Sequence, residues 1–294
     1  MAGSNQVQSF DVLIVGGGPV GLSLGIALAR FVPGINVGLL DRRALTVPRD
    51  SRASAIAAGV RHLFTAIGVW DGMAQAANPI AEMKITDSGR ADISRPVLLD
   101  FVGPRTPGEP FAHMVPNTVS AASLIAAAQD LVTIVEPGAV SAFSAGPAHG
   151  LVTLDDGRSL SAGLIVAADG GRSMLRGLAG IRALSHDYRQ SGLVTTISHA
   201  QPHHDVAYEH FRPAGPFASL PLAGNQSSLV WTEKPETAQD LMAMSPGDLA
   251  HRIESAMGSV LGPVEIVETV QSFPLNLVLA HRLHGWHWWA MRLT

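Results

Sequence analysis

Apolar and polar positions near the start of the chain change from one pattern to another within about thirty residues. Residues 11–15 form a short, almost wholly apolar run, which is typical of a buried parallel strand. Glycines and a proline follow, and Pro33 and Gly34 end the next segment. A second apolar run at 36–40 stops at Asp41. This order predicts a strand, a glycine turn, a helix and a second strand, which together begin an α/β fold.

The rest of the first half alternates between segments with the apolar spacing of a helix and short apolar segments typical of strands. The predicted elements are a helix at 56–67, strands at 80–86 and 96–101, a helix at 117–128, strands at 132–135 and 139–143, a hairpin at 155–157 and a strand at 163–167. Asn117 is expected to cap the second helix through its side chain.

The second half has a different pattern. From residue 192 to residue 231, short segments alternate apolar and polar positions, with proline or glycine at the breaks. Such alternation predicts an antiparallel sheet separate from the α/β unit at the start of the chain. Ser245 should cap a helix that runs to Met257, and 264–272 is expected to be one further strand.

Composition limits the class of protein. The chain has 294 residues, 47% of them hydrophobic and 15% charged, which favours a globular protein of about two domains. A net charge of -4 gives no electrostatic indication of a nucleic-acid-binding protein, so no nucleic-acid partner is expected. The absence of cysteine excludes disulfides and thiolate metal sites, and is consistent with a cytoplasmic location.

Two N-terminal stretches bear on targeting. Residues 1–9 lack the basic and apolar regions of a secretory signal, so none is expected. Residues 12–29 are long and apolar enough to suggest a membrane span, but Gly16, Gly18 and Gly21 within them have the G-x-G-x-x-G spacing typical of a nucleotide-binding turn. A peripheral association with a membrane stays open.

The glycine turn carries the first candidate chemistry. Gly16, Gly18 and Gly21 have G-x-G-x-x-G spacing directly after the first strand. They allow the tight turn, the approach of a pyrophosphate and close packing of the helix on the sheet. The helix N-terminus attracts an anion. Asp41, at the end of the second strand, can accept both hydroxyls of an adenosine ribose.

Other candidates are weaker when taken alone. Arg42, Arg43, Arg49 and Arg52 follow the second strand, and for Arg43 and Arg49 a solvated loop is the preferred interpretation. Asp169-Gly170, after a buried strand, fits an ordinary turn or a turn that faces a ligand. Histidines at 203, 204, 281, 284 and 287 lack the spacing and the carboxylate of a metal site, so no metal is expected.

Several motifs together resemble a known family. They are GGGPVG at 16–21 with Asp41-Arg42, DSRA at 50–53, ADGGRSMLR at 168–176, and AYEHFRPAGPFASLPL at 207–222 ahead of Leu229-Val230-Trp231. Over almost the whole chain the sequence is similar to the ubiquinone-biosynthesis hydroxylases, which are flavin-dependent aromatic hydroxylases of the p-hydroxybenzoate hydroxylase type. The resemblance implies an FAD-dependent monooxygenase that uses NAD(P)H and O₂ to hydroxylate a prenylated phenol.

The resemblance also implies site residues. Gly16, Gly18 and Gly21 would form the FAD pyrophosphate turn, Asp41 would accept the ribose, Arg42 and Arg52 would flank adenine and pyrophosphate, Val140 would meet adenine through its main chain, and Asp169-Gly170 would serve FAD and NAD(P)H. No residue is identified as the base that activates the phenol. Five residues offer apolar surface for a prenyl tail: Phe211, Phe217, Leu220, Leu222 and Trp231.

The expected fold is α/β, with a Rossmann-like FAD-binding domain and an antiparallel-sheet substrate domain. The first domain should comprise 1–78, 111–182 and 270–294, and the second 79–110 and 183–269. The family's later Gly-Asp motif has no counterpart here, so the first domain is expected to be incomplete at its C-terminus. Self-association through an apolar patch at Trp286, Trp288 and Trp289 would then follow.

Two other functions stay open. One is a non-catalytic form that binds or scaffolds a biosynthetic complex. The other is a flavoprotein of the same fold with different chemistry, such as an epoxidase or a prenyl reductase.

Overall fold

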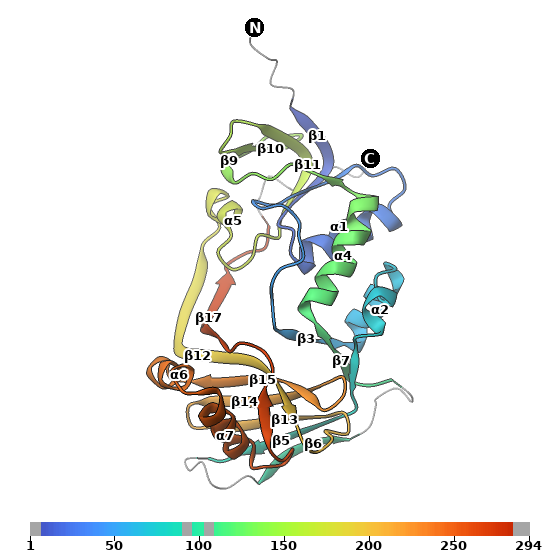
Figure 1. The fold of residues 1–294 in the computed structure, drawn as a ribbon. Helices are drawn as coiled ribbons and strands as arrows, with labels where there is room; N and C mark the ends of the chain where they lie inside the picture. The colour runs from blue at the N-terminus through green and yellow to red at the C-terminus, as the bar shows by residue number, and fades with distance from the viewer. Residues whose placement is uncertain (1–6, 90–95, 103–108, 285–294) are drawn as a thin grey trace.

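The computed structural model describes residues 7–89, 96–102 and 109–284 of the 294-residue chain, and they form three sheets (Figure 1). A six-stranded sheet lies near the N-terminus, and an eight-stranded sheet lies at the opposite end of the molecule. A three-stranded sheet lies between them. The mixed α/β class predicted from the sequence is confirmed.

The six-stranded sheet contains the predicted nucleotide-binding unit. Its strands, in spatial order, are β8 (Thr133–Ile134), β2 (Val37–Leu40), β1 (Gln8–Val15), β11 (Ser159–Ala167), β10 (Gly150–Leu154) and β9 (Val140–Ala145). The first four are parallel, whereas β10 and β9 are added antiparallel. Helices α1 (Pro19–Phe31) and α4 (Asn117–Leu131) pack on one face, where Ile14, Ile26 and Leu124 are fully buried.

The three-stranded sheet joins the two larger ones. It consists of β3 (Ala53–Ala57), β7 (Ala112–Pro116) and β4 (Asn78–Ile80), with the short helices α2 (Ala58–Ala66) and α3 (Asp71–Ala74) nearby in the chain. Ile80 and Met114 of this sheet pack directly on Ala207 and Leu222 of the eight-stranded sheet.

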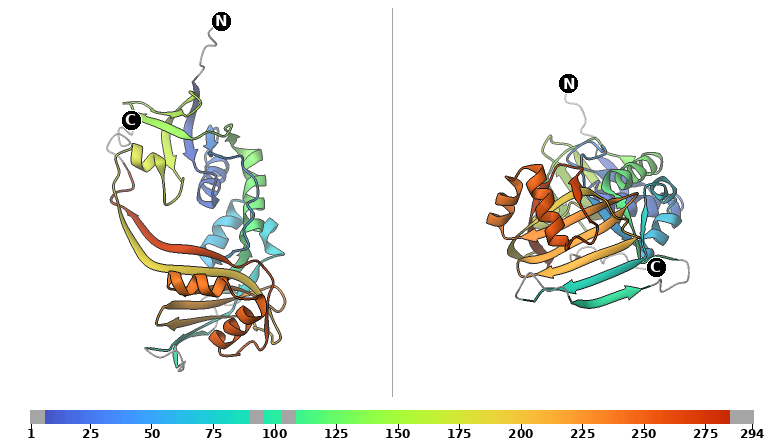
Figure 2. Two further views of the ribbon diagram at one scale, coloured as in Figure 1. Left: turned by 60° about the vertical axis from the view of Figure 1, so that its left-hand side comes forward. Right: turned by 60° about the horizontal axis from the view of Figure 1, so that its bottom comes forward.

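The eight-stranded sheet is almost entirely antiparallel. Its strands are β5 (Glu82–Asp87), β6 (Val97–Val102), β12 (Ala183–His199), β13 (Val206–Arg212), β14 (Gly215–Leu222), β15 (Gln226–Glu233), β16 (Val264–Ile266) and β17 (Gln271–Ala280). Only β5 and β13 pair in parallel. Helices α6 (Pro235–Met242) and α7 (Pro246–Met257) cover the face turned away from the six-stranded sheet (Figure 2).

Most local predictions agree with the structure. The strand, turn, helix and strand at the start are present, as are the hairpin at 155–157 and the antiparallel strands within 192–231. Ser245 caps α7, because its Oγ accepts a hydrogen bond from the Asp248 N–H at 3.2 Å.

Three predictions about local structure were wrong. Asn117 does not cap α4, since Pro116 holds the cap position and the Asn117 side chain binds Asp50 and Ser54 instead. Residues 53–57 form β3, so the helix begins two residues later than its apolar pattern predicted. The strand expected at 264–272 is divided, because β16 and β17 pair with different parts of β12.

One segment assigned to the first proposed domain pairs with a strand of the second. Residues 270–294 were grouped with the nucleotide-binding segments, yet β17 pairs with β12 along most of its length. The two strands run between the two large sheets as one ribbon (Figure 1). The division itself stays a proposal.

Two further sequence expectations concern membranes and the C-terminus. The apolar stretch at 12–29 forms part of β1 and of the thirteen-residue helix α1. In the part of the chain that the structure describes, no helix is long and apolar enough to cross a membrane. The patch at Trp286, Trp288 and Trp289 lies outside the described residues.

Candidate functional site

The glycine turn between β1 and α1 is packed too tightly for side chains at two of its three motif positions. Gly16 has φ = +121°, and a Cβ there would overlap the carbonyl group of Ala168. A Cβ at Gly21 would overlap the Gly16 carbonyl oxygen. At Gly18, by contrast, nothing lies within 4 Å of the position that a Cβ would take. The turn therefore leaves open space at the one glycine where a pyrophosphate would approach.

The first turn of α1 is suited to an anion. Gly18 is the N-cap residue and supplies no side-chain acceptor, and Pro19 begins the helix. The first N–H groups of a helix lack intrahelical partners and carry partial positive charge. With no side chain to satisfy them, they can donate to a phosphate.

Asp41 lies directly beside this turn. Its Oδ2 accepts a hydrogen bond from the Gly17 N–H at 2.7 Å, and its Oδ1 accepts one from the Arg43 N–H at 3.0 Å. A carboxylate has about four acceptor positions, so two remain for ribose hydroxyls. Arg42 is exposed next to it. The carboxylate thus orders the turn and still has acceptor positions to spare.

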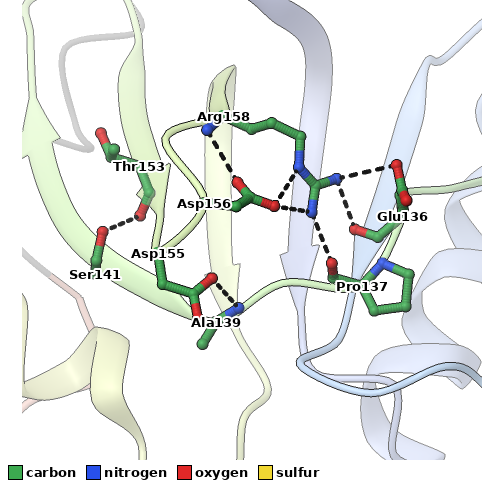
Figure 3. A network of polar contacts seen from close by, with 8 residues as sticks. All are labelled: Glu136, Pro137, Ala139, Ser141, Thr153, Asp155, Asp156 and Arg158. Carbon is green, nitrogen blue, oxygen red and sulfur yellow. Dashed lines mark hydrogen bonds and ion pairs between the residues drawn. The ribbon is translucent and has the colours of Figure 1, made fainter.

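The segment that leads into β9 crosses the end of β2. The Gly138 N–H donates to the Asp41 carbonyl at 3.2 Å, which brings the residues before Val140 to the proposed ribose site. Arg158 fixes this crossing, because its guanidinium donates to the carbonyls of Glu136 and Pro137 at 2.9 and 2.6 Å (Figure 3). Val140 is half-buried at the start of β9.

Asp169 follows β11 and borders the glycine turn. Gly16 is close enough to the Ala168–Asp169 peptide that a Cβ on it would lie 2.8 Å from the Asp169 nitrogen. One carboxylate oxygen, Oδ2, accepts from the Leu175 N–H at 3.2 Å. The other, Oδ1, is buried and has no hydrogen-bond partner. An unpaired buried carboxylate oxygen is costly, so this atom fits a ligand with a hydroxyl or N–H donor.

Gly170 supports this arrangement. Its φ is +83°, a conformation that glycine adopts without strain. Nothing lies within 4 Å of the position of its missing Cβ, so the backbone here is open to a ligand. In the chain, Gly170 directly follows Asp169, whose Oδ1 has no hydrogen-bond partner.

Arg52 is held by two neighbours. Its guanidinium pairs with Asp50 at 2.8 Å, and the Asn117 amide also donates to Asp50 at 2.9 Å. The Arg52 hydrogen bonds, with that of Asn117, lower the pKa of the Asp50 carboxyl to about 2. The Arg52 guanidinium carbon also lies 4.7 Å from the centroid of the Phe273 ring on β17. Arg52 is therefore fixed at the junction of the two large sheets.

A cavity of about 520 Å³ opens at this junction. It is lined by Arg49, Asp50, Ser51, Arg52, Ala53, Pro116, Thr118, Thr196, Leu222, Gln226, Val267, Glu268, Thr269 and Gln271. The Ser51 hydroxyl is buried with no hydrogen-bond partner. The cavity is large enough for part of a cofactor or a small aromatic ligand.

Two residues that line this cavity, Asp50 and Ser51, and the Asn117 side chain that binds Asp50 were not predicted from the sequence. Asp50, Ser51 and Asn117 were not proposed as site residues, although Asp50 and Ser51 lie in the same short motif as Arg52. Nothing in the sequence indicated that Asn117 contacts Asp50, because the Asn117 side chain was expected to cap a helix. It is the fold that places it against Asp50.

The histidines do not form a metal site among the described residues. No group of three or more His, Cys, Asp or Glu side chains that could hold a metal occurs within them. His203 is buried and uses both ring nitrogens, one toward the Leu222 carbonyl and one toward the Asp205 N–H. His287 lies outside the described residues.

Three features lie along one edge of a largely parallel sheet: the open space at Gly18, the Asp41 carboxylate and the unpaired Asp169 Oδ1. They define the class as a dinucleotide-binding α/β protein. A family model described as "FAD binding domain" matches residues 9–285. The chain belongs to this family, and within it to the ubiquinone-biosynthesis FAD hydroxylases.

Curated relatives support that placement. The chain is 36% identical to ubiquinone hydroxylase UbiL of Rhodospirillum rubrum over 278 residues, which is 92% of this chain and 63% of the relative. It is 31% identical to 3-demethoxyubiquinol 3-hydroxylase of Escherichia coli K12 over 278 residues, or 92% and 68% of the two chains. It is 30% identical to ubiquinone hydroxylase UbiM of Neisseria meningitidis, over 94% of this chain and 60% of the relative. The chain thus spans roughly two thirds or less of these relatives' length.

Solved structures have the same fold. The tetrameric form of 2-methyl-3-hydroxypyridine-5-carboxylic acid oxygenase superposes with a TM-score of 0.73 at 16% identity, over 94% of this chain and 72% of that one. PqsL of P. aeruginosa in complex with 2-aminobenzoylacetate gives 0.73 at 20% identity, over 91% and 74%. The flavin-dependent monooxygenase PieE, in complex with FAD and substrate, gives 0.71 at 20%, over 94% and 51%. At these identities the likeness shows the fold.

Proposed function

We propose that the protein is an FAD-dependent monooxygenase that hydroxylates the aromatic ring of a prenylated phenol in ubiquinone biosynthesis, with NAD(P)H and O₂ as co-substrates. The orphaned Asp169 Oδ1 beside the glycine turn carries the cofactor part of this proposal. The named relatives support the reaction and the pathway.

Each site residue has a part in holding FAD. The N–H groups at the start of α1 would bind the pyrophosphate, and Asp41 would accept the adenosine ribose. The main chain at Val140 would meet adenine, and Asp169 would accept from a hydroxyl of the ligand. Arg52 would lie along the cofactor near the cavity. FAD, when bound, supplies the redox and oxygen-transfer chemistry, and the protein orients the ring and excludes water.

The apolar residues proposed for the prenyl tail lie on two different faces. Leu220 and Leu222 pack toward the three-stranded sheet, and Leu222 lines the cavity. Phe217 and Trp231 instead pack against α6 and α7, so they belong to the core. The proposed surface for the tail is therefore restricted to the first pair, with the exposed Phe211 beyond it.

The test uses the purified chain supplied with FAD. NAD(P)H oxidation and O₂ uptake should rise when a prenylated phenol is added, and mass spectrometry should show a product with one added oxygen. Faster turnover of short polar benzoates would contradict the substrate class. Bound FAD with no turnover of any phenol would favour a binding or scaffold role.

Association with a membrane surface, a biosynthetic complex or a second copy also belongs to the proposal. Strand β6 is at one edge of the eight-stranded sheet, where Val97, Leu98 and Val102 are 61–67% exposed. An edge strand with apolar residues on both faces is a surface that other molecules can cover. Co-sedimentation with lipid vesicles and light scattering of the free protein would distinguish these partners.

A further inference from the structure

The two faces of the eight-stranded sheet have different neighbours. Leu193, Leu229 and Trp231 point to α6 and α7, and together they form a closed apolar core. Successive residues of a strand point to opposite faces, so the residues between them point the other way. Ala207 and Leu222 confirm the direction, since they pack on the three-stranded sheet beside the cavity. We refer to this second face as the inner face.

One row of cross-strand neighbours traverses the inner face. From β6 through β5, β13, β14, β15 and β12 to β17 it consists of Leu99, Ile85, Glu209, Ala218, Val230, Val194 and Gln271. Directly paired residues of one row share a face, and their side chains contact each other. Glu209 is the one charged residue in a row that is otherwise apolar except for its terminal glutamine.

The Glu209 carboxylate is half-buried and unpaired. Within the described residues, no hydrogen bond or ion pair joins it to another group. Burial raises the pKa of this carboxyl above its usual range. Taking a carboxylate out of water without a partner costs free energy, and such groups concentrate at functional sites.

A second glutamate of the same sheet shows the contrast. Glu233 is buried on β15, where its Oε1 accepts from the Arg212 guanidinium at 3.1 Å and from the Trp231 Nε1 at 3.0 Å. A structural carboxylate in this sheet is thus provided with donors, whereas Glu209 is not.

The row containing Glu209 leads to the cavity. Gln271, at its end, lines the cavity, as does Thr196, two residues from Val194 on β12. Neighbouring strands are about 4.8 Å apart, so the three steps from β12 to β13 span about 14 Å. A phenol ring with an apolar substituent can extend over that distance along Ala218 and Val230.

We propose that Glu209 accepts a hydrogen bond from the ring hydroxyl of the aromatic substrate, an inference that rests on the proposed function. The phenol O–H donates to the carboxylate, which supplies the missing partner on the inner face. This bond increases electron density on the ring oxygen and on the carbons ortho and para to it. A raised carboxyl pKa strengthens the acceptor, because it reduces the mismatch with a weakly acidic phenol.

Calorimetry on the full chain supplied with FAD tests this without turnover. The probes are 2-(3-methylbut-2-enyl)phenol and its methyl ether, which differ in the one O–H donor. The parent protein should bind the phenol about 10- to 100-fold more tightly than the ether, as for a hydrogen bond to a charged group. Glu209→Leu should remove this preference and leave the affinity for the ether unchanged. Glu209→Gln should retain part of it, since the amide oxygen still accepts.

The matched control is Glu236→Leu, which removes an exposed carboxylate on α6 and should keep the parent's preference. Thermal unfolding of Glu209→Leu without ligand, at or above the parent's midpoint, would show that the variant is folded. A preference for the phenol that persists in Glu209→Leu would overturn the inference, and so would an equal loss of both probes. If the parent binds neither probe, the proposed substrate class fails, and the inference fails with it.

Discussion

The two regions that we propose to face ligands are built in different ways. At the edge of the six-stranded sheet, the contacts come from the backbone: missing side chains at Gly16 and Gly18, and free N–H groups at the start of α1. On the inner face of the eight-stranded sheet, they come from alternate side chains of strands far apart in sequence. A side chain added in the first region would overlap its backbone at Gly16, whereas the proposed role of the second region depends on one side chain, that of Glu209.

The largest effect is expected from Gly21→Ala. The added Cβ would overlap the Gly16 carbonyl oxygen, and neither backbone can move without disturbing the β1–α1 turn. We expect a loss of about 3 kcal/mol in the free energy of unfolding, the upper range for overpacking. Urea denaturation measures it.

Gly18→Ala is the matched control for that variant, because its Cβ would have no neighbour within 4 Å. The free energy of unfolding should change by less than about 1 kcal/mol, as for a cap substitution, while FAD affinity falls at least about 10-fold. Equal destabilisation by both alanines would show that the turn has no space reserved for a ligand.

Asp169→Asn should separate binding from folding. The remaining amide oxygen can still accept from the Leu175 N–H, so stability should hardly change. The orphaned Oδ1 is lost as an acceptor, so FAD affinity should fall by about 10- to 100-fold. Flavin fluorescence during titration gives the dissociation constant, and an unchanged value would remove Asp169 from the cofactor site.

Asp41→Arg places a cation where the ribose hydroxyls would be accepted. FAD affinity should fall by about 10-fold or more, and NAD(P)H affinity far less. Because Asp41 also accepts from the Gly17 N–H, Asp41→Asn serves as the control that keeps this bond. Equal losses for both nucleotides would assign the site to the nicotinamide cofactor.

The smallest effect is expected from Asp50→Asn. The folded-state pKa of Asp50 is depressed from 3.8 to about 2, so its ionised form stabilises the fold above pH 3.8 and this contribution is lost as the pH falls through 2. Because Arg52 is 45% exposed, we expect less than about 1 kcal/mol. Unfolding midpoints of parent and variant should therefore converge between pH 4 and pH 2. If the difference between the two unfolding midpoints did not change with pH, the Asp50–Arg52 ion pair would be excluded as its cause.

These two regions also differ in how far the sequence predicted them. The strand, glycine turn, helix and acid near the N-terminus were predicted, and so was the Ser245 cap of α7, because each depends on residues close together in the chain. The alternation within 192–231 likewise predicted antiparallel strands.

Most local elements and the family could thus be predicted from the amino-acid sequence, since spacing, turns and caps are short-range. The predictions that were wrong, such as the Asn117 cap, involve contacts with residues far away in the chain. Which face of each strand lies beside the cavity could be seen only in the folded protein. Period-two alternation separates Leu220 from Phe217, but it does not say which of them lies against helices and which beside the cavity. It was also the fold that brought Gly16 against Ala168 and left Glu209 without a partner, because those relations join residues far apart in the chain.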